Sequence, residues 1–494
     1  MKNGLAQYGS QLAQFSSIAV ITRLVVLVEA FIALKIFTNL LSVSEYGLYE
    51  LSYSLAIMIS FISSGGFPQS INRYIIRFDS RNKTKVANDL FYTALITVFL
   101  INFALLIFLF GSFYANLELI DSPNYFTLLI GIGLLAVFMG SNHLLIGLVR
   151  ARQLVKWYAI LFVLKAFIGL VLEIILVFFL KFQVFGMLLG LSGGEACGFF
   201  LFFIWLFRER AFGHFSKHRL MELLKFGLPL TISQAIGTSI NFLIAFLIFS
   251  YASSEELAYF ALGNSVSSLI NILIIGITTA YNPIIGKLYE QGLKDSLTSF
   301  TNIVLRFYLV LSIPFILFLT SLAPILIVLF SNENYLPGAV VVPYILISLF
   351  FTPLTTITTQ GGFLKYRMDL VTIVYAIAAG ITILFAFLII PIYGIIGASI
   401  VLIIQAVLHF IFKFALSQYL YKIEFEIRRL GKIIIAIVPG VLLLLFLNSV
   451  SLFGAFCAIL IFIFLIFFLK GLTISEFKSA VGLLLSQTKV NRTR

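Results

Sequence analysis

Residues 370–412 read LVTIVYAIAAGITILFAFLIIPIYGIIGASIVLIIQAVLHFIF, a run of 43 residues without an aspartate, glutamate, lysine or arginine. A membrane-spanning helix needs about 20 apolar residues, so this run supplies two spans, 370–390 and 394–416, of which the second continues four residues past the run. The whole chain of 494 residues is 61% hydrophobic and 11% charged, with a mean hydropathy of +1.10. A soluble domain has roughly 45–50% apolar and about 25% charged residues. The sequence therefore predicts an all-α polytopic membrane protein and excludes a soluble globular or disordered chain.

Apolar blocks of similar length recur along the chain, and we expect fourteen spans in all. They are residues 14–41, 47–67, 90–113, 124–149, 157–180, 184–207, 223–251, 257–285, 303–330, 338–363, 370–390, 394–416, 433–448 and 452–469. Fourteen spans take up roughly 280–350 residues, so every separator is short and none can hold a folded soluble domain. This argues against ATP-driven exporters with a fused nucleotide-binding domain. It argues equally against membrane glycosyltransferases and polymerases that need a large external loop.

The basic residues predict how the spans are oriented. Of the 33 lysines and arginines, 29 fall in alternate connections or within four residues of them, in the N-terminal segment or in the C-terminal tail. Only Lys181 lies on the opposite side, and three others lie within spans. Because basic residues mark cytoplasmic connections, we expect both termini in the cytoplasm. The net charge of +13 is then explained by topology and anionic lipid, without a nucleic-acid partner.

Short motifs recur six spans apart. Ser44-Glu45-x-x-x-Tyr49 returns as Ser254-Glu255-x-x-x-Tyr259, and Gly147-x-x-Arg150-x-Arg152 returns as Gly362-x-x-Lys365-x-Arg367. Each motif alone can be explained by glycine at a helix end and arginine beside the membrane. Together, at an even spacing of six spans, they predict two bundles that enter the membrane in the same direction, as in transporters with parallel repeats.

We therefore expect two parallel six-helix bundles around a central cavity, followed by two further helices. The predicted domains are residues 1–210 for the N-terminal bundle, 211–422 for the C-terminal bundle, 423–470 for spans 13 and 14, and 471–494 for a basic cytoplasmic tail. Such bundles can rock between inward-open and outward-open states around one central site.

Motifs for catalysis are missing from the sequence. There is no phosphate-binding P-loop, no HExxH zinc motif, no GxSxG nucleophile and no GxGxxG dinucleotide motif. Cys197 and Cys457 stand far apart in apolar runs, and His214 and His218 have no cysteine or carboxylate partners that would complete a metal site. We therefore expect that the protein is not an enzyme. We also expect that it needs no metal, no other cofactor and no ATP.

Ionisable residues inside the predicted spans are the candidate site. Each costs at least about 2.5–3.5 kcal/mol at the bilayer centre, so each needs a partner, a wet cavity or an escape route. Apart from Lys225, Arg306 and Lys413, which flank cytoplasmic connections, they are three bases and four acids, all in the first half: Arg23, Lys35 and Lys165, and Glu29, Glu50, Glu173 and Glu195. An alternative is that they form internal ion pairs, because Lys165 and Glu173 lie eight residues apart, about 80° around a helix. Lys35 lies near the outer end of its span, where its side chain can also reach the membrane surface.

Three stretches resemble the polysaccharide-transport branch of the multidrug/oligosaccharidyl-lipid/polysaccharide (MOP) exporters. They are Asn39-Leu-Leu-Ser-Val-Ser-Glu-Tyr-Gly-Leu-Tyr49, Phe226-Gly-Leu-Pro229 and Ile390-Pro-Ile-Tyr-Gly-Ile-Ile-Gly-Ala398. The similarity extends over nearly the whole chain and is greatest to O-antigen flippases of bacterial inner membranes. The resemblance implies movement of undecaprenyl-pyrophosphate-linked oligosaccharide units from the cytoplasmic to the periplasmic leaflet, driven by an H⁺ or Na⁺ gradient. Membrane lipid and other polysaccharide-assembly membrane proteins are the further partners it implies.

With that substrate, the intramembrane charges take two expected roles. Arg23 and Lys165, with Lys35, bind the pyrophosphate, because arginine offers a planar fork of donors and lysine a point charge. The ion-coupling candidates are the carboxylates Glu29, Glu173, Glu195 and Glu50. Two relatives of the same superfamily remain alternatives, a multidrug–cation antiporter and a flippase for peptidoglycan-precursor lipids. An O-antigen polymerase or ligase is the opposing enzyme class, and its large periplasmic loop is missing here.

Overall fold

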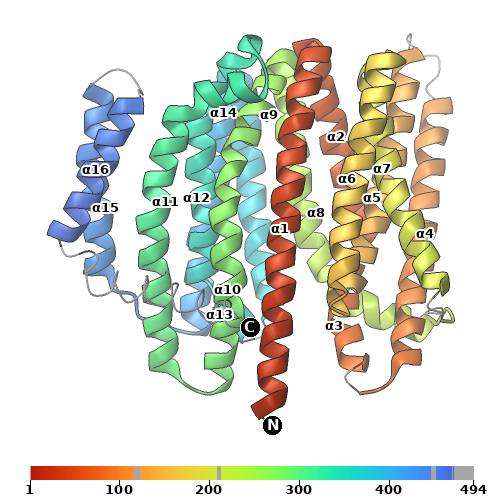
Figure 1. Ribbon diagram of the computed structural model, residues 1–494, viewed down its shortest axis with the longest axis horizontal. Helices are drawn as coiled ribbons and strands as arrows, with labels where there is room; N and C mark the ends of the chain where they lie inside the picture. Colours follow the sequence, from red (N-terminus) through yellow and green to blue (C-terminus); the bar gives the residue numbers. More distant parts are fainter. Residues whose placement is uncertain are drawn as a thin grey trace. The chain divides into compact units, whose positions relative to one another are not determined.

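Helices make up almost all of the computed structural model, which describes residues 2–79, 81–115, 123–208, 213–365, 367–446, 452–469 and 471. They are α1 (Lys2–Leu40), α2 (Val43–Ser64), α3 (Phe67–Asp79), α4 (Thr84–Ala115), α5 (Pro123–Ala151), α6 (Val155–Ile174), α7 (Gln183–Arg208), α8 (Lys217–Tyr251), α9 (Ser254–Ser267), α10 (Asn271–Glu290), α11 (Lys294–Phe330), α12 (Val342–Thr358), α13 (Gly361–Leu364), α14 (Met368–Leu420), α15 (Ile427–Phe446) and α16 (Leu452–Phe468) (Figure 1). Shorter turns are a π-helical turn, Ile175–Phe179, and 3₁₀ segments at Ser268–Ile270 and Glu333–Val341. No strand occurs in these ranges, which confirms the predicted all-α class.

Nine helices in the described ranges are long and apolar enough to cross a membrane. The predicted spans lie within the helices along nearly all of their length. The number of fourteen crossings stays a prediction, because several predicted spans correspond to shorter or broken helices such as α9 and α10. The basic tail predicted for residues 471–494 lies outside the described residues, apart from Gly471.

The chain divides into two compact units, each assembled from segments that are distant in sequence. Unit 1 consists of Met1–Leu262, Ile327–Gly338 and Tyr375–Val401. Unit 2 consists of Gly263–Leu326, Ala339–Val374 and Leu402–Arg494. The domain boundaries predicted at residues 210, 422 and 470 stay predictions.

In unit 1, α3 is a helix in a segment that the sequence assigned to a connection between spans. Gly65 and Gly66 have positive φ angles of 56° and 63°, a conformation that glycine adopts without strain, and they end α2 and redirect the chain. Every fourth residue of α3, namely Phe67, Ile71 and Ile75, is fully buried in a core shared with α4, α5, α6, α7 and α8. The opposite face of α3 is left to carry polar side chains.

Glycines allow α7 to pack closely against α6, which lies beside it (Figure 1). Gly190, Gly194 and Gly198 recur every four residues and so share one face of α7. A β-carbon at Gly190 would collide with the backbone of Glu173, and one at Gly194 with the carbonyl of Lys165. Small residues at this spacing are typical of close helix contacts in membranes. The contact fixes the register between the charged residues of α6 and α7.

The two copies of the Ser-Glu-x-x-x-Tyr motif meet in unit 1. The hydroxyls of Ser44 on α2 and Ser254 on α9 are 2.7 Å apart. A β-carbon at Gly47 would collide with the carbonyl of Ser254, so α2 and α9 touch backbone to backbone here. Positions separated by 210 residues in the sequence are therefore neighbours, as expected for a repeat whose axis passes between them.

Long helix α14 is broken at Gly394, the first residue of the predicted span 394–416. Gly394 has φ 52° and ψ −132°, which is not helical and which a residue with a side chain would adopt only under strain. The backbone N–H of Ile395 donates to the carboxylate of Glu256 on α9 at 3.3 Å. Glu256 thus satisfies a backbone donor at the start of the second half of α14.

In unit 2, buried polar contacts join the helices around an apolar core. The hydroxyl of Tyr281 on α10 donates to the carbonyl of Ile357 on α12 at 2.8 Å. Asn302 of α11 donates to the carbonyl of Glu424 at 2.8 Å and accepts from the N–H of Glu426 at 3.0 Å. These bonds hold the segment that leads from α14 into α15 against α11.

Candidate functional site

A polar cavity of about 380 Å³ lies within unit 1, and we call it the basic cavity. Side chains from α1, α2, α3, α5, α6, α7 and α8 line it. Its polar and charged lining residues are Arg23, Ser64, Gln69, Asn72, His143, Arg150, Lys165, Glu195 and Gln234. The lining contains three permanent cations and one carboxylate. The cavity therefore carries an excess of positive charge and favours an anionic ligand.

Arg23 and Lys165, which the sequence proposed as phosphate ligands, both line this cavity. Arg23 is on α1 and Lys165 is on α6, so the fold brings together residues 142 positions apart. Arg150, at the end of α5, is a third cation in the lining. Its guanidinium lies 5.9 Å from the ring centre of Tyr158, a cation–π contact that leaves its donors available to a ligand.

Lys165 forms an ion pair with Glu195 across the contact between α6 and α7. Its Nζ donates to Oε1 of Glu195 at 2.6 Å, and it also lies 5.2 Å from the ring centre of Phe162. Asn142 of α5 donates to the backbone carbonyl of Glu195 at 2.7 Å and to its Oε2 at 2.5 Å. The partner of Lys165 is thus Glu195 and not Glu173, the residue considered from spacing along α6.

Two buried polar atoms at the wall of the basic cavity have no hydrogen-bond partner in the described part of the chain. They are Nδ1 of His143 and Oε1 of Gln69. The His143 ring packs against Phe61 with ring centres 4.5 Å apart. Buried polar groups are nearly always satisfied, so these atoms are available to a water or to a polar ligand.

Lys35, the third proposed phosphate ligand, lies elsewhere in unit 1. Its ammonium donates to the carbonyl of Val328 at 3.0 Å and to the carbonyl of Ser331. These carbonyls belong to the C-terminal end of α11, where cations are stabilising. Lys35 is not in the lining of the basic cavity.

The other three proposed ion-coupling carboxylates also lie outside the lining of the basic cavity. Glu173 is 3% exposed beneath Gly190 and lies within electrostatic range of Glu29. Glu50 lies on α2, one turn after Tyr46. Glu195 is therefore the one proposed coupling residue that shares a cavity with Arg23 and Lys165.

Sequence reasoning missed Arg150 and the polar face of α3. Arg150 lies beside a predicted cytoplasmic connection, where arginines that determine topology are common, so the sequence does not distinguish it from them. Gln69 and Asn72 lie in the segment expected to be a connection. The signal for α3 was present, because Phe67, Ile71 and Ile75 recur every four residues between polar ones.

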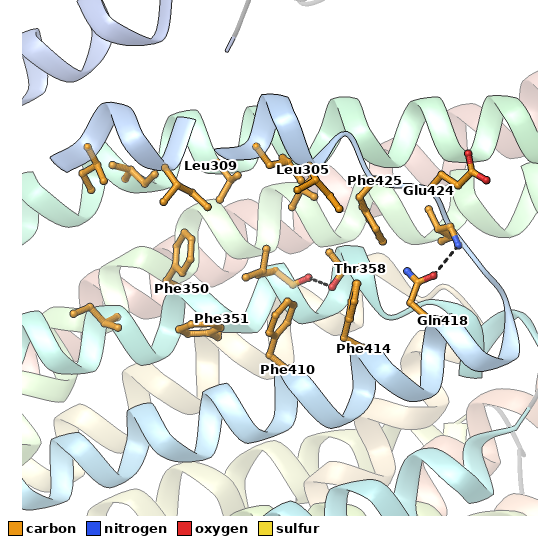
Figure 2. A pocket seen from close by; sticks show the side chains of 18 of the residues that line it. Leu305, Leu309, Phe350, Phe351, Thr358, Phe410, Phe414, Gln418, Glu424 and Phe425 are labelled. Atoms are coloured by element: carbon orange, nitrogen blue, oxygen red, sulfur yellow. Dashed lines mark hydrogen bonds between the residues drawn. The ribbon is translucent and has the colours of Figure 1, made fainter. Parts of the chain in front are cut away.

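A second cavity, in unit 2, is almost entirely apolar, and we call it the apolar groove. It has a volume of about 1050 Å³ and is lined by leucines, isoleucines and phenylalanines of α11, α12, α14 and α15. Figure 2 shows Phe350, Phe351, Phe410 and Phe414 along one side of it. The few polar or charged lining residues are Thr358, which donates to the carbonyl of Leu354 at 2.7 Å, Gln418, whose Oε1 accepts from the N–H of Ile423 at 3.1 Å, and Lys422 and Glu424. Such a wall suits hydrocarbon and not sugar or phosphate.

The family model described as "Polysaccharide biosynthesis protein" matches residues 13–289, more than half of the chain. The model described as "MatE" matches residues 229–390. No curated protein matches the chain in sequence.

Solved structures of MATE transporters share the fold. An inward-facing multidrug resistance MATE family transporter of the MOP superfamily is 16% identical, with a TM-score of 0.64 over 82% of this chain and 99% of that chain. An outward-facing structure with the same description is 17% identical, with a TM-score of 0.59 over 83% of this chain and 95% of that chain. A MATE transporter of Vibrio cholerae is 14% identical, with a TM-score of 0.58 over 84% and 97%. The chain is therefore a multi-pass membrane protein that belongs to the polysaccharide biosynthesis protein family, in the MOP superfamily, and has the fold of the MATE transporters.

Proposed function

We propose that this protein is a flippase that moves undecaprenyl-pyrophosphate-linked oligosaccharide repeat units from the cytoplasmic to the periplasmic leaflet of a bacterial inner membrane. It would do so by alternating access, for the synthesis of O-antigen or another surface polysaccharide, and with both termini in the cytoplasm. No bond is made or broken in this reaction, so the chain needs binding groups and a moving barrier but no catalytic residues. The family match to polysaccharide biosynthesis proteins supports this substrate class.

The observation that carries the proposal is the charge of the basic cavity. Three cations, Arg23, Arg150 and Lys165, line it together with a single carboxylate. A pyrophosphate is a dense anion with acceptor oxygens only, so it pairs with guanidinium and ammonium donors. The orphaned Nδ1 of His143 can donate to the same oxygens when it carries the proton.

Glu195 can couple the binding of an ion to the binding of the substrate. As a carboxylate it holds Lys165 at 2.6 Å and reduces the charge available to the pyrophosphate. Proton binding at Glu195 would remove that competition and release the ammonium for the substrate. Departure of the substrate on the far side would let the pair re-form. This is why we place Glu195 ahead of Glu29, Glu50 and Glu173 as the coupling residue.

The apolar groove supports a substrate that also has a long hydrocarbon part. A polyprenyl chain is apolar throughout and would lose little by leaving the lipid for a wall of leucine, isoleucine and phenylalanine. A water-soluble drug or sugar would gain nothing there.

Multidrug–cation antiport is the second candidate, favoured by the MatE match to residues 229–390. The basic cavity argues against it, because a cationic drug would be repelled by three cations where one carboxylate is already paired. A flippase for peptidoglycan-precursor lipids would fit the same cavity, since those lipids also carry a pyrophosphate.

Deletion of the gene tests the proposal and separates these candidates. In the deletion strain we expect lipid-linked repeat units to accumulate in the cytoplasmic leaflet and surface polysaccharide to disappear. The intact gene should reverse both effects. Altered drug susceptibility with normal surface polysaccharide would favour the antiporter. Lysis with accumulated peptidoglycan precursors would favour the precursor flippase.

A further inference from the structure

A third cavity, in unit 2, has a wall of hydroxyl groups, and we call it the threonine cavity. It has a volume of about 240 Å³ and lies among α12, α13 and α14. Its polar lining residues are Thr355, Thr356, Thr359, Gln360, Lys413 and Ser417. Gly362 of the repeated Gly-x-x-Lys-x-Arg motif is also in the wall, just as Gly147 of the first copy lines the basic cavity. The two copies of this motif thus each border a polar cavity.

All three threonines of the lining present hydrogen-bond acceptors. Thr355 donates its hydroxyl proton to the carbonyl of Phe351 at 2.7 Å, Thr356 to that of Thr352 at 3.0 Å, and Thr359 to that of Thr355 at 2.7 Å. A hydroxyl whose proton is committed to the backbone can offer a ligand only the lone pairs of its oxygen. Ser417 accepts from the N–H of Gly361 at 2.8 Å, and this leaves its own proton to donate.

Lys413 is the one charged side chain among the residues that line the threonine cavity. Its ammonium gives a positive charge to a wall that otherwise consists mainly of acceptors and apolar atoms. Gln360 is 6% exposed, and its amide nitrogen donates to the carbonyl of Thr356. The cavity thus combines several acceptors, one cation and no carboxylate within its described lining.

This combination selects among ligand classes. A phosphate would be attracted by Lys413, but it has only acceptor oxygens and would place them against the three threonine oxygens. A metal cation would be repelled by Lys413, and an apolar group would leave buried acceptors unsatisfied. A sugar ring carries hydroxyls that donate to the threonines and accept from the hydroxyl of Ser417. The volume is below the range of about 300–1,000 Å³ typical of drug-sized ligands, and so suits a single ring.

We propose that the threonine cavity binds one sugar ring of the lipid-linked oligosaccharide during transport. This inference rests on the proposed function and adds to it a sugar-recognition site in unit 2, distinct from the pyrophosphate site in unit 1. The basic cavity would then bind every substrate of this lipid class, whereas the threonine cavity would respond to the sugar.

The test uses the purified full-length chain in lipid nanodiscs and two probes. One probe is undecaprenyl pyrophosphate, which has no sugar, and the other is the lipid-linked oligosaccharide extracted from the deletion strain. In the variant Thr355→Val/Thr359→Val two acceptor oxygens are replaced by methyl groups of similar size. We expect its affinity for the lipid-linked oligosaccharide to fall about tenfold, because two sugar hydroxyls lose their partners, and its affinity for undecaprenyl pyrophosphate to stay unchanged.

Two further variants control for folding. Thr372 makes the same bond to its own helix, with the carbonyl of Met368 at 3.0 Å, but does not line the cavity, so Thr372→Val should change neither affinity. Thr355→Ser/Thr359→Ser keeps both oxygens and should bind both lipids like the unaltered chain. If the double valine variant does not fold, Thr355→Val alone should still weaken binding of the oligosaccharide about threefold.

The inference is wrong if the valine variants bind the lipid-linked oligosaccharide as tightly as the unaltered chain, or if they lose affinity for both lipids equally. Failure of the unaltered chain to bind either lipid would overturn the proposed function and this inference with it. Binding of undecaprenyl pyrophosphate that is lost in Arg23→Ala, together with unchanged sugar discrimination in the valine variants, would leave the proposed function standing and remove only the sugar site.

Discussion

At the scale of single residues, substrate binding depends on how the charges of the basic cavity interact with one another. Arg23, Arg150 and Lys165 come from three helices, and Glu195 is bonded to one of them. A ligand anion must therefore compete with Glu195 for Lys165, but it meets Arg23 and Arg150 without such competition from the cavity lining.

Arg23→Ala should abolish complementation of the deletion strain while the protein stays at its normal level in the membrane. A hydrogen bond to a charged group contributes about 1.5–3 kcal/mol, so binding of undecaprenyl pyrophosphate should weaken about tenfold to a hundredfold. Lys156→Ala is the matched control, because Lys156 is an exposed cation at the start of α6 and does not line the cavity. Full surface polysaccharide in the Arg23 variant would remove this residue from the site.

Glu195→Gln should separate binding from transport. The neutral amide competes less for Lys165, so undecaprenyl pyrophosphate should bind about tenfold more tightly. Complementation should nevertheless fall, because the substrate is not released by re-formation of the pair. Glu222→Gln is the control, since Glu222 pairs with Arg219 at 2.7 Å away from the cavity. Equal or weaker binding by the Glu195 variant would contradict the assigned role.

At the scale of helices, the contact between α6 and α7 decides where Lys165 and Glu195 meet. Hydropathy predicted both helices, since their apolar runs exceed the thickness of the bilayer. It could not predict their register, which depends on how closely Gly190 and Gly194 let the backbones approach. Residue spacing along α6 alone therefore could not predict that Lys165 pairs with Glu195 on α7.

Gly194→Ala should test that contact. A β-carbon there would collide with the carbonyl of Lys165, and overpacking of this kind typically costs about 1–3 kcal/mol. We expect a lower Tm in detergent and reduced complementation. Gly111 on α4 has open space around it, so Gly111→Ala should leave the Tm unchanged or raise it slightly, as alanine favours a helix. The same Tm for both variants would show that the α6–α7 contact is not tight.

The sequence did not predict that α3 contributes residues to the basic cavity. A helix of 13 residues is too short to be recognised as a span, and its basic residues resembled those of any cytoplasmic connection. Its placement depends on Gly65 and Gly66, whose positive φ angles turn the chain directly after α2. Gln69 and Asn72 reach the cavity only because of that turn.

At the scale of the whole molecule, alternating access requires that one end of the transport path opens when the other closes. The contact of Ser44 with Ser254 joins equivalent positions of the two motif copies, on the side that the basic residues predict to be periplasmic. The repeat was visible in the sequence, but the sequence did not show that its copies touch. If the substrate leaves on this side, α2 and α9 must separate there.

A disulfide between Ser44→Cys and Ser254→Cys should therefore block transport. Hydroxyls 2.7 Å apart mark side chains close enough for a bond between two sulfurs. Cys197 and Cys457 are first replaced by alanine to leave a single possible pair. We expect the oxidised double variant to fail in complementation and the reduced form, or either single variant, to succeed. Full activity of the cross-linked protein would show that this end does not open.

Transfer of the lipid between leaflets by the purified protein is the most direct measurement. The chain is reconstituted in vesicles loaded with lipid-linked oligosaccharide from the deletion strain, an ion gradient is imposed, and the sugar exposed outside is measured with a lectin. We expect rapid exposure with the unaltered protein and the background rate with Arg23→Ala at equal protein content. Exposure at the background rate with folded, unaltered protein under both H⁺ and Na⁺ gradients, or gradient-driven uptake of a cationic drug in its place, would contradict the proposal that this protein is a lipid-linked oligosaccharide flippase.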